Sequence, residues 1–457
     1  MQVTPARLVP QLTAFSATVF GLSYMSPMVV IGTLGLIAVL TGGAVASAYA
    51  MATVGMFLTA LSYAYMARRL PVAGSAYTYA SRTLGPLWGY AVGWLVLLDY
   101  VFIPMVCCIF ISVSLASLAP SVPFWVWPCA VASTSTTINI LGIAVTHRVN
   151  LAVMIVQLLT ISVILVACAR HLILGSAADG ISLSYPFLAA APSLSKFVAG
   201  VALASYSFLG FDAVSTLAEE THNPSQSIPT AIMLATLIGG AIFGICAYAL
   251  MAVHPSLRFD NIDTAAYEIV GTVAGQPLRV ICTVVVVLAY FTAQISTHAS
   301  VCRLLMVMGR DDILPRAVFG YVSTRFRTPV ANILIIGAIM LAAGIGLSIK
   351  TSTSFINFGA FSAFLFVNVC AALHARRHGE GRWQRTSPVI VGLLGGAVCV
   401  TLLFGLERSA QAAGLIWSVL GLSYLAFKTR LFRRDLPPID VAIDSGQSCA
   451  AKRAVPQ

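Results

Sequence analysis

The chain of 457 residues is 59% hydrophobic and only 9% charged, with a mean hydropathy of +0.91. Soluble domains carry about 25% charged residues, so this composition excludes a chain whose whole surface faces water. Long continuous apolar runs also exclude a transmembrane β-barrel, whose strands are short and alternate in hydropathy. We therefore expect an all-α integral membrane protein, in which each span uses roughly 20 apolar residues.

Twelve apolar segments are long enough for us to expect them to cross the membrane. In chain order they are 12–38, 42–67, 86–118, 122–144, 149–170, 195–217, 227–253, 274–308, 329–349, 353–375, 387–406 and 411–430. A short tail, 1–11, precedes them, and a polar tail, 431–457, follows them and is expected to be disordered. These segments leave no soluble domain of catalytic size and no helix-borne nucleophile constellation, so we do not expect an enzyme.

The basic residues fall unevenly on the two sides of these expected spans. With the amino terminus inside, only a few of the 26 Lys and Arg residues lie outside, namely Arg170, Lys196, Arg258, Arg279, Lys350 and Arg408. The positive-inside rule then places both termini in the cytoplasm, and we expect a multi-pass protein of the inner cell membrane. The net charge of +11 is explained by this topology, so we expect membrane lipid and no nucleic acid as a partner. The ten cysteines show no metal-ligand spacing, and neither a metal nor a cofactor is expected.

Two expected spans are interrupted at matching places. The first carries Gly21 and Pro27 near its middle, and the sixth carries Gly210 followed by Asp212. Unwound backbone inside a membrane is tolerated only where it faces protein or a water-lined cavity. A matched pair of breaks indicates a transporter site at the interface of two repeats, although Gly and Pro can also simply kink membrane helices. The candidate substrate-binding residues at the breaks are Gly21, Ser23, Tyr24, Ser26, Ser207, Phe208, Gly210 and Asp212.

Several short motifs carry a family resemblance. They are 71–79 (PVAGSAYTY), 97–100 (LLDY), 208–214 (FLGFDAV) with 219–221 (EET), 296–305 (STHASVCRLL) and 356–360 (INFGA). Together they resemble the amino acid–polyamine–organocation transporters, and most closely the bacterial putrescine importer branch. The resemblance implies a LeuT-like fold, with ten helices in a five-plus-five inverted repeat over 12–375 and two peripheral helices over 387–430. It also implies a substrate held between helices one, three, six and eight.

Buried acids are the strongest functional candidates. Of the 15 Asp and Glu residues, only Asp99 and Asp212 lie well inside the expected spans, where a carboxylate costs several kcal/mol unless it is compensated. Asp99 is expected to bind a substrate ammonium, with a structural hydrogen bond as the alternative. Asp212 is expected to bind substrate, to carry a coupled proton, or to satisfy backbone N–H groups freed by the break.

Other side chains extend this candidate site. Tyr100 offers a ring face to an ammonium, although neighbouring helix positions point about 100° apart. Phe208 is expected either to line the site or to pack in the protein core. At the cytoplasmic end of the sixth span, Glu219 and Glu220 are candidates for an inner gate or for ordinary solvated positions. His298 in the eighth span is a coupling candidate or a buried structural histidine.

The first break also bears on the substrate. Permeases of this superfamily usually place a glycine-rich triplet there for a substrate carboxylate, whereas this chain has 24–26 (YMS), which is less suited to an anion. We therefore expect import of a small cationic amine, putrescine or a related polyamine, driven by protons, by the membrane potential or by both. The fifth span lacks the lysine that some proton-coupled relatives use. The alternatives are a proton-coupled amino acid permease, an amino acid/amine exchanger and, from another class, a membrane receptor or scaffold.

Overall fold

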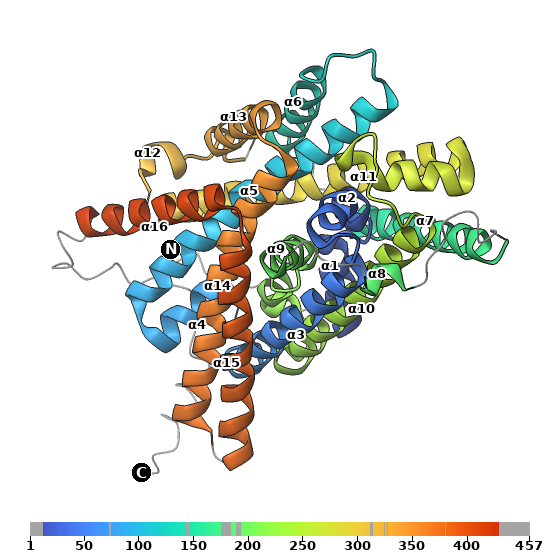
Figure 1. Ribbon diagram of the computed structural model, residues 1–457. Coiled ribbons are helices and arrows are strands. Elements are labelled where there is room, and N and C mark those ends of the chain that lie inside the picture. The colour runs from blue at the N-terminus through green and yellow to red at the C-terminus, as the bar shows by residue number, and fades with distance from the viewer. Residues whose placement is uncertain are drawn as a thin grey trace, which may run out of the picture.

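The computed structural model describes residues 12–72, 75–142, 147–174, 184–188, 193–310, 314–323, 325–326, 328–379 and 381–428. Over these ranges the regular structure is helical and contains no strand (Figure 1). The single β-bridge in the described part of the chain joins Leu12 to Thr221. The all-α fold class expected from composition is therefore confirmed. The expected tails, 1–11 and 431–457, lie outside the described residues.

The longer helices follow most of the expected spans. They are α1 (Ala14–Met25), α2 (Val29–Thr41), α3 (Val45–Arg69), α5 (Pro86–Leu118), α6 (Val126–Ile140), α7 (His147–Leu174), α9 (Leu194–Ser205), α10 (Pro224–Val253), α11 (Ala265–Arg310), α13 (Val330–Gly346), α14 (Ile349–His378), α15 (Arg382–Gly405) and α16 (Arg408–Lys428). The sixth span continues beyond α9 as two 3-10 helices, η2 (Tyr206–Phe208) and η3 (Ala213–Glu220).

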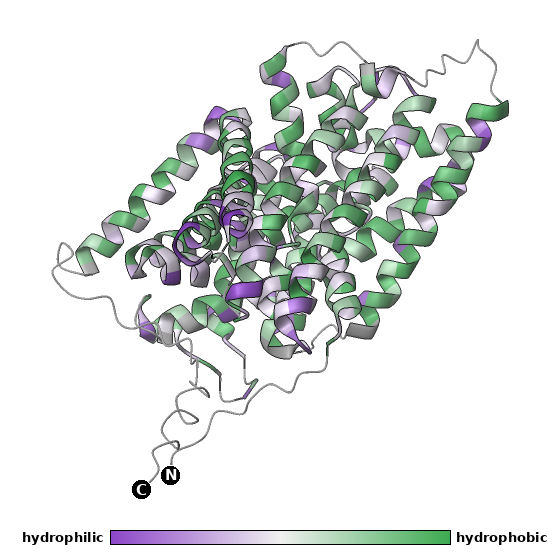
Figure 2. Ribbon diagram, turned by 90° about the horizontal axis from the view of Figure 1, so that it is seen from below, coloured by the Kyte–Doolittle hydropathy of each residue, from purple (hydrophilic) through white to green (hydrophobic). Residues whose placement is uncertain are grey.

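Within the described ranges, nine helical segments are long and apolar enough to cross a membrane. The pair α1 and α2, bent by 50° at its break, makes a tenth span. Figure 2 shows hydrophobic residues along most of the helices and hydrophilic residues in a few segments. This arrangement is that of an integral membrane protein. With only 15 and 17 residues, α6 and α13 are shorter than the expected spans, so the count of twelve stays a prediction.

Short helices also occur where no span was expected. They are α4 (Ser75–Leu84), α8 (Tyr185–Leu188), η4 (Ile262–Thr264) and α12 (Arg316–Phe319). The α4 helix is too short and too polar to be a membrane span, and it follows soon after the end of α3. The range of α11 covers two helices that meet at a kink at Gly275, where φ is +83°, and the second of them begins close to the start expected for the eighth span.

The α5 helix packs against α6, α11, α13, α14 and α16, so it lies at the centre of the bundle (Figure 1). Its contact with α14 is close: a Cβ atom added to Gly359 would lie 3.1 Å from the backbone nitrogen of Asp99. On its other face α14 is joined to α3 by Asn368, which accepts a hydrogen bond from Ser62 and donates one to Thr59. Interhelical side-chain hydrogen bonds of this kind hold membrane helices in register.

Candidate functional site

The first helix is broken between α1 and α2. Ser26 has a φ of +54°, a conformation that few non-glycine residues adopt. Its hydroxyl donates a hydrogen bond to Gln157 Oε1 (3.0 Å), and the Met28 N–H donates to the same oxygen (3.2 Å). Gln157 lies on α7 and is only 3% exposed. A side chain from another helix therefore fixes the backbone at this break.

The sixth span is broken between η2 and η3. Gly210 has a φ of +125°, which excludes an ordinary side chain. Its N–H donates a hydrogen bond to Asp212 Oδ1 (3.2 Å). The hydroxyl and the N–H of Ser215 both donate to the Asp212 carbonyl. The backbone after Gly210 is therefore held by residues of the same segment, and one Asp212 oxygen has the structural contact expected of an acid beside freed backbone. Before the break, the Ala202 carbonyl accepts a hydrogen bond from the side-chain amide of Asn357 on α14 (2.8 Å).

The two breaks touch each other. A Cβ atom added to Gly210 would lie 2.5 Å from Cδ1 of Tyr24, so the Tyr24 ring rests directly on the backbone of the sixth span. Tyr24 belongs to the last turn of α1 and is half-buried. The glycine is therefore required both for its backbone conformation and for this contact.

A small central cavity of about 30 Å³ lies at the meeting of the two breaks with α5 and α11. This is room for about one water molecule. The residues that line it include the predicted Tyr24 and Ser26 together with Cys107, Tyr206 and Tyr290. Its location between spans one, three, six and eight is the one expected from the family resemblance. The last three residues were not predicted, although Cys107 lies eight positions, or about two helical turns, after Asp99 on α5.

Aromatic rings close this central cavity toward the carboxyl-terminal half of α5. Phe110 stacks on Tyr290 with ring centroids 4.7 Å apart and an interplanar angle of 6°. It also stacks on Tyr206 at 6.4 Å. All three side chains are buried, so a solute cannot reach the cavity from that side without moving them.

Buried Asp99 and half-buried Asp212 lie near this cavity, in one group with the tyrosines. Asp99 is 7% exposed and its Oδ1 has no hydrogen-bond partner. It interacts electrostatically with Asp212, and Tyr100 interacts with both acids. Tyr24 is within electrostatic range of all three. Neither acid lines the cavity. Among the predicted residues, Tyr24 both lines the cavity and is within electrostatic range of the two acids.

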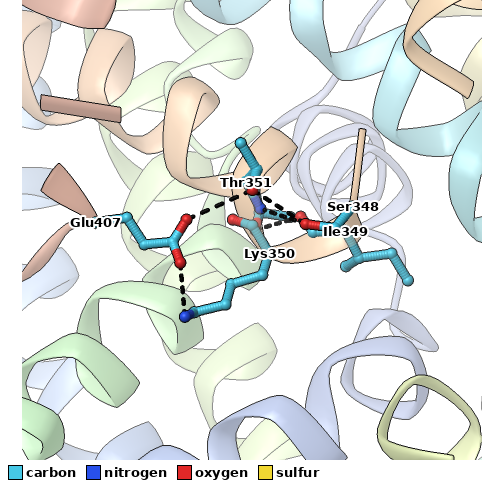
Figure 3. Close-up of polar contacts among 6 residues, drawn as sticks. Ser348, Ile349, Lys350, Thr351 and Glu407 are labelled. Atoms are coloured by element: carbon cyan, nitrogen blue, oxygen red, sulfur yellow. Dashed lines mark hydrogen bonds and ion pairs between the residues drawn. The ribbon is translucent and has the colours of Figure 1, made fainter. Parts of the chain in front are cut away.

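No described basic side chain forms an ion pair with either of these acids. The ion pair in the described part of the chain joins Lys350, at the start of α14, to Glu407 before α16, with Nζ and Oε1 2.6 Å apart (Figure 3). Thr351 donates a second hydrogen bond to the same carboxylate. Two carboxyl groups in a buried place repel each other when both are charged, and a nearby cation or proton relieves this repulsion.

A larger cavity, which we call the vestibule, has a volume of about 390 Å³ and lies among α1, α7, α11 and α13. Its lining includes Ser23, Tyr24, Gln157, Ser300 and Arg303. Ser23 also donates a hydrogen bond to the sulfur of Met154 on α7. The predicted Ser23 therefore faces the vestibule, whereas Ser26 faces the central cavity.

Three other predicted residues lie in packed surroundings. A Cβ atom on Gly21 would lie 2.7 Å from Val214, so Gly21 provides a close approach between α1 and η3. Ser207 is fully buried and shares a hydrogen bond with Tyr49 of α3. Phe208 packs edge-on against Phe243 of α10, with ring centroids 5.4 Å apart. None of these side chains is among the lining of the two cavities.

The remaining coupling candidates are His298, Glu219 and Glu220. His298 is fully buried on α11, where Nε2 is 3.1 Å from the Ile333 carbonyl and Nδ1 has no partner. If Nε2 donates to this carbonyl, the free lone pair is on Nδ1. The side chains of Glu219 and Glu220 lie outside the described residues, so their gating role stays a prediction. No metal-binding group of His, Cys, Asp or Glu is found among the described side chains.

Sequence comparison decides the family. A family model described as amino acid permease matches residues 12–425. The chain belongs to this family of transporters. It is 36% identical over 430 residues to the low-affinity putrescine importer PlaP of Escherichia coli, covering 93% of this chain and 95% of that protein. The resemblance expected from the motifs, including the putrescine importer branch, is thereby confirmed.

Two further relatives show the range of this permease family. The branched-chain amino acid permease BcaP of Bacillus subtilis is 24% identical, with 90% of this chain and 91% of that protein covered. The vacuolar cationic amino acid transporter 4 of Arabidopsis thaliana is 29% identical over 350 residues, with 72% and 57% covered. These relatives are transporters, so the family is one of transport proteins and not of enzymes.

Proposed function

We propose that this permease imports a small cationic amine, putrescine or a related polyamine. The observation that carries the proposal is the pair Asp99 and Asp212, which interact electrostatically beside the central cavity with no described basic partner. A diamine brings one ammonium for each carboxylate, so it would neutralise both. The similarity to a protein named as a putrescine importer supports the same substrate class.

The amine would occupy the central cavity at the two breaks after the cavity has widened. The Ser26 hydroxyl at the first break donates its hydrogen bond to Gln157, and the bulky 24–26 segment offers no glycine-rich nest for a carboxylate. The rings of Tyr24, Tyr206 and Tyr290 would supply aromatic faces to an ammonium. This lining suits an amine without a carboxylate better than it suits an ordinary amino acid.

The driving force would come from the membrane potential, from protons or from both. Each positive charge that enters gains about 2.3 kcal/mol per 100 mV, so a diamine gains about 4.6 kcal/mol. A proton on Asp212 would relieve the repulsion from Asp99 when no substrate is bound, which makes Asp212 the first candidate for coupling, before His298. We place the protein in the inner membrane with both termini in the cytoplasm, on the distribution of its basic residues.

A second candidate function is exchange or uptake of an amino acid, which the permease family itself and the amino acid-transporting relatives favour. Uptake by purified protein in liposomes separates the two. We expect radiolabelled putrescine to accumulate when the interior is made negative, and a panel of amino acids to compete poorly. Uptake of an amino acid without any uptake of putrescine would overturn the proposal.

A further inference from the structure

The central cavity and the vestibule are adjacent and share part of their lining. Tyr24, Ala293 and Thr297 line both. Ala293 and Thr297 lie one turn apart on α11, and Tyr24 faces them from the last turn of α1. The partition between the two cavities therefore consists of one aromatic ring against a helix surface with small side chains.

The Tyr24 ring is in contact with neighbours from both broken spans. One turn earlier on α1, the ring of Phe20 lies with its centroid 6.2 Å away. The ring also contacts Gly210, where any side chain would collide with Tyr24. The backbone two residues further on is held by Gln157. The main chain is thus fixed just beyond Tyr24, while its half-buried side chain faces two open volumes.

From this geometry we infer that Tyr24 is a gate between the central cavity and the vestibule. In this structure its ring closes the small cavity, and displacement of the ring joins that cavity to the larger one. A cation on this path passes the ring face, which attracts ammonium groups, and the nearby Asp99 and Asp212. The identity of the transported cation rests on the proposed function, but the barrier itself does not.

Chemical modification of cysteines on either side of the ring tests the gate. Cys107 lines the central cavity and is 3% exposed. Ser300 lines the vestibule and is half-buried, so a Ser300→Cys variant reports from the other side. The probe is the small cationic thiol reagent MTSEA, applied to one face of sealed vesicles with a thiol scavenger on the opposite face. Peptide mass spectrometry then identifies which cysteine is modified, and the face that labels Ser300→Cys is the vestibule face.

From the vestibule face, we expect Ser300→Cys to react quickly and Cys107 slowly while Tyr24 is present. Tyr24→Ala should raise the Cys107 rate at least about tenfold, because modification follows the population of the open form. It should leave the Ser300→Cys rate unchanged. Tyr24→Phe keeps the ring and should behave as the native residue does. A Cys107 rate that is the same with Tyr24 and with Tyr24→Ala would overturn the inference, and so would an equal rise in Tyr24→Phe.

Fully buried Cys246 on α10 lies outside both cavities and serves as a folding control. If Tyr24→Ala also exposes Cys246, the protein has opened generally, and Tyr24→Leu then decides because it keeps apolar bulk without the ring. If Tyr24→Leu raises the modification rate of Cys107 but not that of Cys246, the result supports the gate. If the modification rate of Cys107 does not rise, the result rejects it. These rates are measured without substrate, so they stand even if the protein does not transport putrescine. Slower labelling of Cys107 when putrescine is added is a separate test of the proposed function.

Discussion

The two helix breaks differ in where the polar groups at the break find their hydrogen-bond acceptors. At the first break, Ser26 and Met28 both donate to Gln157, a side chain 131 and 129 positions away in the sequence. At the second, Gly210 and Ser215 bond to Asp212, no more than three positions away. The second break is also tied to other helices, because Asn357 of α14 donates a hydrogen bond to the Ala202 carbonyl and Tyr49 of α3 shares one with Ser207. Its unwound segment nevertheless finds an acceptor in its own Asp212. The first break depends on α7, so it is coupled to any movement of α1 relative to α7.

Removing the distant partner should have the largest effect. Gln157→Leu leaves the Ser26 hydroxyl and the Met28 N–H without their acceptor. Interhelical hydrogen bonds in membranes contribute about 0.6–1.7 kcal/mol each, so the two bonds predict a loss of about 1–3 kcal/mol in the free energy of unfolding. Gln157→Glu keeps an acceptor oxygen and should lose less. Thermal unfolding of the purified variants measures both, and equal losses would show that the shared acceptor is not what matters.

The next largest effect is expected from neutralising Asp99, whose Oδ1 has no hydrogen-bond partner. Asp99→Asn keeps size and removes the charge, so it should weaken amine binding by at least about 1.4 kcal/mol, which is tenfold. Asp260→Asn removes the same charge from the exposed loop before α11, and it is the matched control. Equilibrium binding of radiolabelled putrescine gives both affinities. Unchanged affinity in a well-folded Asp99→Asn protein removes Asp99 from the site.

Two substitutions of Asp212 distinguish a local structural contact from a role in transport. Asp212→Asn keeps a carbonyl oxygen for the Gly210 N–H, whereas Asp212→Ala removes it, so Ala should cost about 1 kcal/mol more stability than Asn. If Asp212 carries the coupled proton, Asp212→Asn abolishes pH-driven uptake and leaves equilibrium binding largely intact. If it contacts substrate, binding falls as well. A loss of stability in Asp212→Asn, without a selective change in binding or flux, would assign it a structural role only.

The smallest expected effect concerns Tyr100. Its ring lies near both acids, and a cation–aromatic contact contributes about 0.5–2 kcal/mol. Tyr100→Phe keeps this contact and should weaken putrescine binding less than Tyr100→Leu does. Two substitutions that are equally harmful would indicate that the hydroxyl or the shape of the side chain matters instead.

The comparison of the two breaks also explains what could be predicted from the sequence. Gly210 and Asp212 are neighbours in the chain, so both the unwinding and its local support are visible in a short motif. The broken first helix was equally predictable from Gly21 and Pro27. Gln157 was not, because a glutamine in an apolar span gives no sign of which distant backbone it will bind.

The same limit applies to the cavity walls. Phe208 was a reasonable wall residue because it lies in the broken segment, but the direction of a side chain at a break depends on packing, and this one points to Phe243. Tyr206 and Tyr290 line the cavity instead. The acids were predictable because charge in a membrane span is costly, while the position of an aromatic residue in such a span depends on neighbours that the sequence does not reveal.

The most direct test of the proposed diamine site is binding of putrescine and of 1-aminobutane, which lacks the second ammonium, to native protein and to Asp99→Asn and Asp212→Asn variants. If each carboxylate pairs with one ammonium, both substitutions weaken putrescine binding, and native protein prefers putrescine to 1-aminobutane by at least about tenfold, or 1.4 kcal/mol. That preference should shrink in either variant. Equal affinity of the native protein for the two amines, unaltered by either substitution, would contradict the account.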